Sequence, residues 1–182
     1  MRLAPIEKPP SLLGRALDAA IRRLLGRSIT PSQVVYNRVP AAWRISLAFQ
    51  LFEQLGSKLP PELRLLVTTR VAQINDCAFC QDIKRAQAVR ERIGTVRFDL
   101  LEQWRTSECF SARERAALAF VEQANQGKRI DDATFAELAR HFDEREIVEL
   151  ALLNAIENFY NRMNLALGID ASDGLEALAR AR

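Results

Sequence analysis

The chain has 182 residues, of which 48% are hydrophobic; this is enough for one substantial core and too apolar for a disordered protein. Its 26 basic and 23 acidic residues leave a formal net charge of +3, without the basic stripe that nucleic-acid-binding proteins carry. No apolar run approaches the ~20 residues of a membrane span. We therefore expect a soluble, cytoplasmic protein that binds neither nucleic acid nor membranes.

The first predicted helix runs from Ser11 to Leu25. Leu13, Leu17 and Leu24 fall on one side of it and arginines on the others, so the helix is amphipathic with a basic polar face. Such a helix can lie on a membrane surface, but packing against its own domain or a sister subunit is the commoner use. We expect packing. A short helical piece then leads to Pro40.

Two longer helices are predicted before the first cysteine. The earlier one has an apolar residue at every fourth position, namely Trp43, Leu47, Leu51 and Leu55. It ends at Gly56, and its aromatic residues are expected in the core. Pro60-Pro61 begins the next helix, because proline fits the first helical turn, and Asn75-Asp76 ends it.

Capping-box spacing predicts two helices in the second half of the chain. The segments Ser111-Ala-Arg-Glu114 and Asp143-Glu-Arg-Glu146 each place Glu three residues after a capping side chain, just ahead of an apolar periodic run. They predict helices at about 112–126 and 144–167. Residues 131–141 fit a shorter helix between them.

The chain as a whole is predicted to be all-α, since no alternating stretch indicates a strand. We divide it into an N-terminal helical extension at residues 1–39, a core at 40–167 and a C-terminal tail at 168–182. The closing segment 171–182 is expected to be frayed or to form a subunit contact.

Chemistry is predicted at Cys77-Ala78-Phe79-Cys80, which begins a helix that ends near Gly94. Two thiols at a helix N-terminus lie near unpaired amide donors and the positive end of the helix dipole. This placement stabilises a thiolate and lets the second thiol resolve a mixed disulfide. Two thiols so close together also suit a reducing compartment better than a structural disulfide framework. Metal binding and an inert helix start are the alternatives.

The surroundings of the cysteine pair resemble the alkylhydroperoxidase D and carboxymuconolactone decarboxylase superfamily. The resemblance covers about residues 40 to 167. It is carried by Leu59-Pro60-Pro61-Glu62-Leu63-Arg64, Leu66-Val67, Arg70-Val71-Ala72-Gln73-Ile74-Asn75, the cysteine pair and Asp82, with Arg113 to Ala119, Val148-Glu149-Leu150, Asn158, Asn161-Arg162 and Asn164 beyond.

This resemblance implies an all-helical homo-oligomer, a dimer, trimer or hexamer. It implies a dithiol that reduces hydroperoxides, or passes on electrons, at the expense of a lipoyl-type or other thiol reductant. No cofactor or metal is expected. The decarboxylase branch uses histidine, and His141, the single histidine, falls at a predicted helix end that suits capping better than catalysis.

Members with a complete site have a Glu twelve residues before the first Cys and a His four residues after the second. Here these positions hold Leu65 and Lys84. Lys84 shares a helix face with Cys80, so its ammonium can favour the Cys80 thiolate by charge. With a usual pKa of ~10.4 it does not readily shuttle protons. Glu62, three residues before Leu65, is better placed for capping its helix.

From these observations we predict a thiol-dependent peroxidase or disulfide reductase, weakened by the missing relay. Cys80 is the candidate attacking thiol, Cys77 the resolving thiol and Lys84 the assisting charge, although the two thiol roles could be reversed. Asp76, as a helix cap, would raise the pKa of Cys77. The alternative function is a non-catalytic scaffold or a small-ligand-binding protein of the same fold.

Two further possibilities concern residues outside this motif. Cys109 and His141 could complete a zinc site with the cysteine pair, but no second closely spaced pair supports it, and Cys109 is expected to be a partly buried loop thiol. Trp43, Phe79 and Trp104 are expected in the core, with a small apolar ligand near one of them as the alternative.

Overall fold

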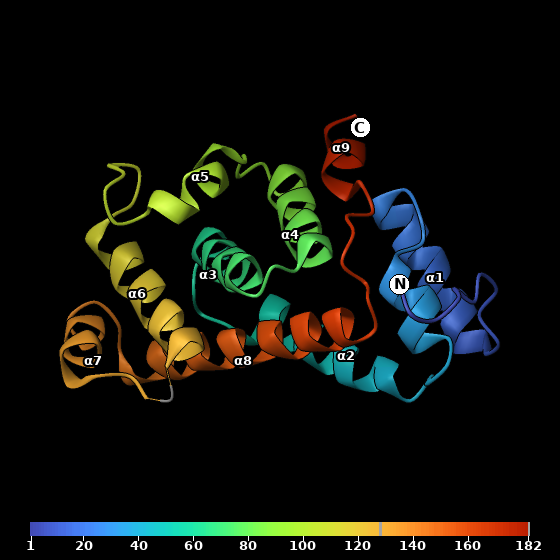
Figure 1. Cartoon of the computed structure of the whole chain (residues 1–182), viewed down its shortest axis with the longest axis horizontal. Coiled ribbons are helices and arrows are strands. Elements are labelled where there is room, and N and C mark those ends of the chain that lie inside the picture. Colours follow the sequence, from blue (N-terminus) through green and yellow to red (C-terminus); the bar gives the residue numbers. More distant parts are fainter. Residues whose placement is uncertain (128, 182) are drawn as a thin grey trace.

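The computed structural model describes residues 1–127 and 129–181, and across these residues the chain is helical without a β-strand (Figure 1). The all-α prediction is therefore confirmed. Of the helices in the described ranges, none has both the length and the hydropathy that crossing a membrane requires.

The first half of the chain follows the predicted order. Ser11 caps the first helix, accepting a hydrogen bond from Gly14 N at 3.0 Å, and Gly26 ends it in a left-handed conformation with φ 89°. The elements are α1 (Leu12–Leu25), the π-helical turn η1 (Ser32–Tyr36), α2 (Ala42–Leu51), which continues into the π-helical turn η2 (Phe52–Gly56), α3 (Pro61–Ile74) and α4 (Ala78–Arg90).

The second half confirms both predicted capping boxes. Ser111 and Glu114 exchange hydrogen bonds at the start of one helix, and Asp143 and Glu146 do so at the start of the other. The elements are α5 (Val96–Asp99), the 3-10 turn η3 (Leu101–Gln103), α6 (Ala112–Gln126), α7 (Asp132–Ala139), α8 (Glu144–Ala166) and α9 (Leu175–Arg180).

Helix α3 lies at the centre of the molecule. It packs against α4, α6 and α8, and Figure 1 shows α6 and α4 on either side of it with the long α8 below. Most of its buried apolar side chains enter two core clusters. One cluster joins α3 to α6, α7 and α8, and the other joins it to α4, η3 and α6. The side chains of α3 that fill these clusters are Leu63, Leu65, Leu66, Val67 and Val71.

The C-terminal segment packs against its own chain. The prediction of a frayed end is therefore wrong for residues 171–181, and Arg182 lies outside the described residues. Helix α9 packs along α4. The buried carboxylate of Asp82 accepts hydrogen bonds from the backbone N–H groups of Leu175 at 2.8 Å and Glu176 at 2.9 Å, and Leu175 is buried. Asp82 thus caps α9 from a neighbouring helix.

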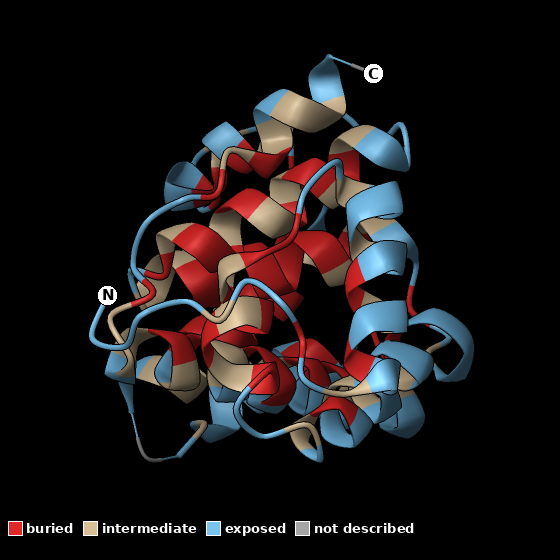
Figure 2. Cartoon of the chain, turned by 90° about the vertical axis from the view of Figure 1, so that its right-hand side faces the viewer, coloured by how far each residue is buried: buried red, intermediate tan, exposed pale blue. Residues whose placement is uncertain are grey.

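The long α2 and η2 segment turns only part of its apolar stripe inward. Trp43 is buried as predicted and stacks on Tyr36, with ring centroids 4.3 Å apart. Leu47, Leu51 and Leu55 are instead exposed. Figure 2 shows the buried residues gathered inside the molecule and the outer faces of the surface helices open to solvent.

Candidate functional site

The cysteine pair joins the turn after α3 to the first turn of α4. Cys77 occupies the position just before the helix and Cys80 lies within it, and the two form a disulfide. Cys77 has no exposed surface and Cys80 has 2%. The predicted helix start is confirmed. Asp76, however, is not its cap: it is exposed, and its left-handed φ of 54° places it in the preceding turn.

A cavity of about 630 Å³ opens beside Cys80. Cys80 is the member of the pair that lines it, together with Lys84 one helical turn further along α4. Trp43 and Phe79, two of the three aromatic residues considered from the sequence, also line it; the third, Trp104, is buried elsewhere and donates to Glu122 at 2.8 Å. Apolar residues of α1, η1 and the segment between them close the remaining wall, among them Leu17, Ile21, Leu25, Ile29 and Tyr36.

Lys84 is buried between two carboxylates that the sequence did not associate with it. Its Nζ lies 3.6 Å from Glu53 Oε2 on η2 and 3.3 Å from Glu157 Oε2 on α8. Burial by itself lowers the pKa of Lys84, but the attraction of both carboxylates outweighs this effect and raises that pKa above its usual range. Lys84 therefore holds a positive charge beside Cys80.

Glu157 is 1% exposed, and its pKa is raised. The main cause is burial, and the nearby charge of Glu53 adds to it, while Lys84 opposes both. Its other oxygen, Oε1, accepts a hydrogen bond from Asn161 Nδ2 at 2.6 Å. Glu157 thus lies in a fixed position with one oxygen toward Lys84.

Two further asparagines connect α8 to the dithiol. Asn164 Nδ2 donates to Cys80 Sγ at 3.5 Å, and Asn75 Nδ2 donates to Asn161 Oδ1 at 3.0 Å from the turn just before Cys77. Asn75, Asn161 and Asn164, which the sequence indicated only through the family resemblance, thus have hydrogen-bonding roles next to the dithiol. A buried polar strip on α8 therefore runs from the carboxylate cluster to the Cys80 sulfur.

Position 65, where family members with a complete site have a glutamate, is not part of the cavity. Leu65 is buried in the apolar cluster formed with α4, η3 and α6 and does not line the cavity. Glu62 forms an ion pair with Arg97 of α5 and makes no side-chain cap on its helix. Neither residue approaches Lys84 as a partner, and Glu53 and Glu157 provide the carboxylates instead.

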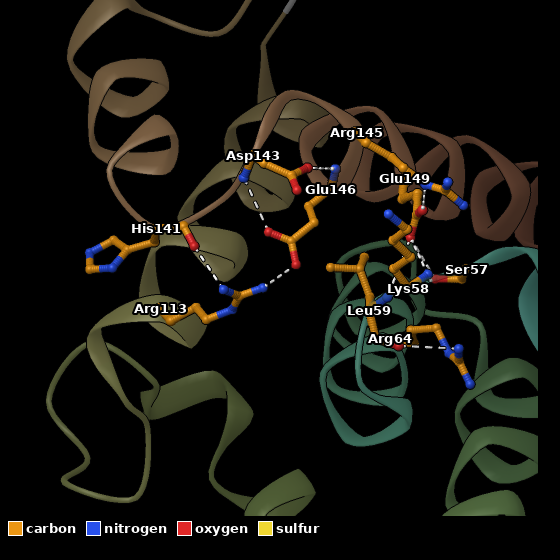
Figure 3. Close-up of polar contacts among 10 residues, drawn as sticks. All are labelled: Ser57, Lys58, Leu59, Arg64, Arg113, His141, Asp143, Arg145, Glu146 and Glu149. Atoms are coloured by element: carbon orange, nitrogen blue, oxygen red, sulfur yellow. Dashed lines mark hydrogen bonds and ion pairs between the residues drawn. The ribbon is translucent and has the colours of Figure 1, made fainter.

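Glu149, two turns before Glu157 on α8, fixes the turn that follows η2 (Figure 3). One of its oxygens accepts hydrogen bonds from Ser57 Oγ and Lys58 N, both at 2.8 Å, and the other accepts from Arg145 Nε at 2.8 Å. Because Glu53 belongs to the same short element that this turn ends, Glu149 helps to hold Glu53 in place.

His141 and Cys109 take no part in this site. His141 follows the end of α7, where its ring lies 3.1 Å from Glu137 and its carbonyl accepts from Arg113 at 2.9 Å (Figure 3). Cys109 is exposed in the loop before α6 rather than partly buried as expected. Among the residues that the structure describes, no three His, Cys, Asp or Glu side chains gather in a way that could hold a metal ion.

Comparisons with known proteins agree with this architecture. A model of the carboxymuconolactone decarboxylase family matches residues 39–123. The uncharacterized protein YnjA of Escherichia coli K12 is 35% identical over 174 residues, which cover 94% of this chain and 94% of that protein. The chain belongs to the carboxymuconolactone decarboxylase family.

Solved structures share the fold of this family member. A protein of unknown function from Agrobacterium tumefaciens, ATU0492, described as a putative antioxidant defence protein AhpD, is 26% identical, with a TM-score of 0.68 over 72% of this chain and 91% of that chain. A peroxidase-related protein from Silicibacter sp. TM1040 is 23% identical, with a TM-score of 0.83 over 98% and 95%. The debrominase Bmp8 is 23% identical, with a TM-score of 0.75 over 97% and 95%.

The two carboxylates were missed because they are far from Lys84 in the sequence. A signal for Glu157 was nevertheless present. It falls on the same helical face as Leu150 and Leu153, and an acidic residue on an apolar face predicts a buried, paired carboxylate. Glu53 carries no such signal, because the π-helical turn at its position breaks the regular period.

Proposed function

We propose that this protein is a dithiol peroxidase that reduces a small hydroperoxide bound in the cavity beside Cys80. The observation that carries the proposal is the position of Cys80, on the cavity wall next to the buried ammonium of Lys84. The positive charge and the start of α4 both favour a thiolate at Cys80. Cys77 has no exposed surface and does not line the cavity, which supports a resolving rather than an attacking role for it.

The reaction proceeds in two steps. The Cys80 thiolate attacks the outer oxygen of the hydroperoxide, the O–O bond breaks, and an alkoxide leaves and takes up a proton, which gives an alcohol and a Cys80 sulfenic acid. The Cys77 thiol then displaces water from that sulfenic acid and forms the Cys77–Cys80 disulfide. Two electrons pass from the dithiol to the peroxide. A lipoyl-type or other thiol reductant returns the dithiol to its reduced state.

The test measures how fast reduced protein loses its Cys77 and Cys80 thiols on mixing with cumene hydroperoxide. It uses a Cys109→Ser background, because the exposed Cys109 would otherwise react as well. Cys80→Ser should abolish the fast phase, whereas Cys77→Ser should retain it and stop at a sulfenic acid. Thiol loss no faster than that of a free small thiol would refute the peroxidase proposal, and fast loss in Cys80→Ser would reverse the two roles.

A second candidate is a small-ligand-binding protein without turnover. The aromatic lining of the cavity, formed by Tyr36, Trp43, Phe79 and Tyr160, favours it. One structure of the debrominase Bmp8, in which an alanine replaces a cysteine of that protein, is a complex with 2,3,4-tribromopyrrole, so a halogenated aromatic is a suitable probe. Quenching of Trp43 fluorescence that is lost in Trp43→Phe and kept in Trp104→Phe, together with slow thiol oxidation, would favour this function.

A further inference from the structure

The buried cluster at the dithiol holds two carboxylates and one ammonium. Glu53 and Glu157 both contact Lys84, and all three side chains are at least nine-tenths buried and close to the cavity. If every group were ionised, the cluster would carry a net negative charge with little water around it. Buried charge without a partner is strongly disfavoured. One of the two carboxylates therefore keeps a proton.

The retained proton belongs on Glu157. Glu157 is the more buried of the two carboxylates, and burial together with the charge of Glu53 raises its pKa. Lys84 stays cationic and cannot be the group that exchanges the proton near neutral pH. The other titratable or charged groups that line the cavity are Cys80, Tyr36, Tyr160, Arg90 and Glu91. Burial raises the pKa of both tyrosines, to about 12 for Tyr160.

The cavity wall also has unused hydrogen-bonding capacity at the same place. Asn164 lines the cavity, and its buried Oδ1 has no hydrogen-bond partner within the part of the chain that the structure describes. Asn164 donates to Cys80 Sγ through its other polar atom. A free acceptor on the side chain that contacts the sulfur fits a bound molecule that carries an O–H group.

We propose that Glu157 is the proton donor to the leaving oxygen, in place of the carboxylate that is absent at position 65. As Cys80 takes the outer oxygen, the Glu157 proton passes to the alkoxide, and the alcohol leaves. Glu157 is then an ionised carboxylate. The Cys77 proton leaves with the sulfenic oxygen as water when the disulfide forms, and Glu157 recovers its proton from solvent through the cavity. Lys84 stabilises the ionised carboxylate between these two events. This inference rests on the proposed peroxidase reaction.

A ratio of two rates tests the proposal. Hydroperoxide reduction needs both a thiolate and a proton for the leaving oxygen, whereas alkylation by iodoacetamide needs only the thiolate, because iodide leaves unprotonated. Dividing the first rate by the second cancels changes in the thiolate fraction and in access to Cys80. In Glu157→Gln this ratio should fall by about 10²-fold or more. In the Cys109→Ser parent it should fall as pH rises through the Glu157 pKa, and in Glu157→Gln it should stay low and flat.

Glu53→Gln provides a second, independent variant. Removing the charge of Glu53 lets Glu157 ionise at lower pH, so the decline of the ratio should move to lower pH without disappearing. Glu157→Asp keeps a carboxylic acid and should retain part of the ratio. Glu122→Gln is the matched control, because Glu122 is a buried glutamate of α6 that is paired with Arg70 and Arg105 and does not line the cavity, and it should leave the ratio unchanged.

The outcomes separate the two proposals. If the parent protein reacts with iodoacetamide at Cys80 but not with hydroperoxide, the peroxidase function is wrong. If the parent protein reduces hydroperoxide and Glu157→Gln keeps the parental ratio and its pH dependence, the peroxidase function stands and Glu157 is not the donor. A parallel fall of both rates in Glu157→Gln would assign Glu157 a purely structural role and overturn the inference.

Discussion

At the scale of single residues, Lys84 has the largest predicted effect on stability. Its replacement by methionine leaves Glu53 and Glu157 buried together without a cation. Removing one partner of a buried ion pair costs about 3–5 kcal/mol of unfolding free energy. We expect a loss of this size for Lys84→Met in urea denaturation at pH 7. The exposed Lys58→Met should change stability by less than about 0.5 kcal/mol.

Adding Glu53→Gln and Glu157→Gln to Lys84→Met should recover most of that loss, because no buried charge then remains. If the triple variant is as unstable as the single one, the loss comes from packing of the lysine stem rather than from the unpaired carboxylates. Equal stability of Lys84→Met and the wild-type protein would contradict the buried ion cluster itself.

Glu157 should make the protein less stable as pH rises. Its pKa is raised in the folded state, so folding favours its protonated form. That contribution is complete below the ordinary glutamate pKa of ~4.3 and is lost as pH increases through the folded value, at about 1.4 kcal/mol for each pKa unit between the two states. Glu157→Gln lacks this loss. Lys84 remains charged throughout, because its own pKa is also raised.

Urea denaturation of both proteins between pH 4 and pH 8 measures this dependence. The stability of Glu157→Gln relative to the wild-type protein should increase with pH until the pH exceeds the folded pKa of Glu157. Two parallel curves would mean that Glu157 has the same pKa in the folded and unfolded states. Arg145 and the other donors to Glu149 lower its pKa in spite of its burial, so the wild-type protein loses the contribution of this carboxylate as pH falls. The stability of Glu149→Gln relative to the wild-type protein should therefore increase as pH decreases.

Some contacts of individual residues could be predicted from the sequence, and others could not. The capping residues Ser111 and Asp143 predicted the starts of α6 and α8 correctly, since a cap acts on its own next turn. The dithiol position at the start of α4 followed from the same local reasoning. The partners of Lys84 could not be predicted, because Glu53 and Glu157 reach it only through the packing of η2 and α8 on α4.

At the scale of elements, one carboxylate caps the start of α9. Asp82 accepts both N–H groups at the start of α9, and these donors have no partner within their own helix. Asp82→Ala should therefore cost about 1–3 kcal/mol, because it leaves buried donors unsatisfied. The sequence could not reveal this cap, because it comes from a different helix.

Hydrogen exchange tests this assignment directly. In Asp82→Ala the amides of Leu175 and Glu176 should exchange much faster, while those of α3 should keep most of their protection. The exposed Asp170→Ala, close to the same segment, is the matched control and should leave α9 protected. Unchanged exchange at Leu175 would mean that apolar packing on α4 alone holds the helix.

At the scale of the whole molecule, two helical segments that each carry exposed apolar residues come into contact. One segment is α2 with η2 and the other is α8, and they meet where Phe49 and Phe159 touch edge to face, with ring centroids 5.4 Å apart. We name this the α2–α8 surface; its exposed residues are Leu47, Leu51, Leu55, Val148, Leu152 and Phe159. Apolar surface of this kind is unusual on a monomer and is typical of subunit interfaces.

We expect the protein to be a homo-oligomer in solution that buries the α2–α8 surface between copies. Leu51→Glu combined with Leu152→Glu should dissociate it, because each subunit would have to bury uncompensated carboxylates. Light scattering coupled to size-exclusion chromatography measures the mass. Val96→Glu on α5, where the valine is 73% exposed and lies away from this surface, should leave the mass unchanged.

Assembly and the dithiol site are connected through η2, which carries Glu53 toward Lys84 and Leu55 toward solvent. Covering Leu55 with a second subunit would restrict the motion of η2 and so keep Glu53 in contact with Lys84. The dissociated variant should therefore also show a shift in the pH dependence of hydroperoxide reduction, in the direction expected for Glu53→Gln. A wild-type protein that is monomeric at all concentrations would contradict the interface, and a dissociated variant with the wild-type pH profile would separate assembly from the site.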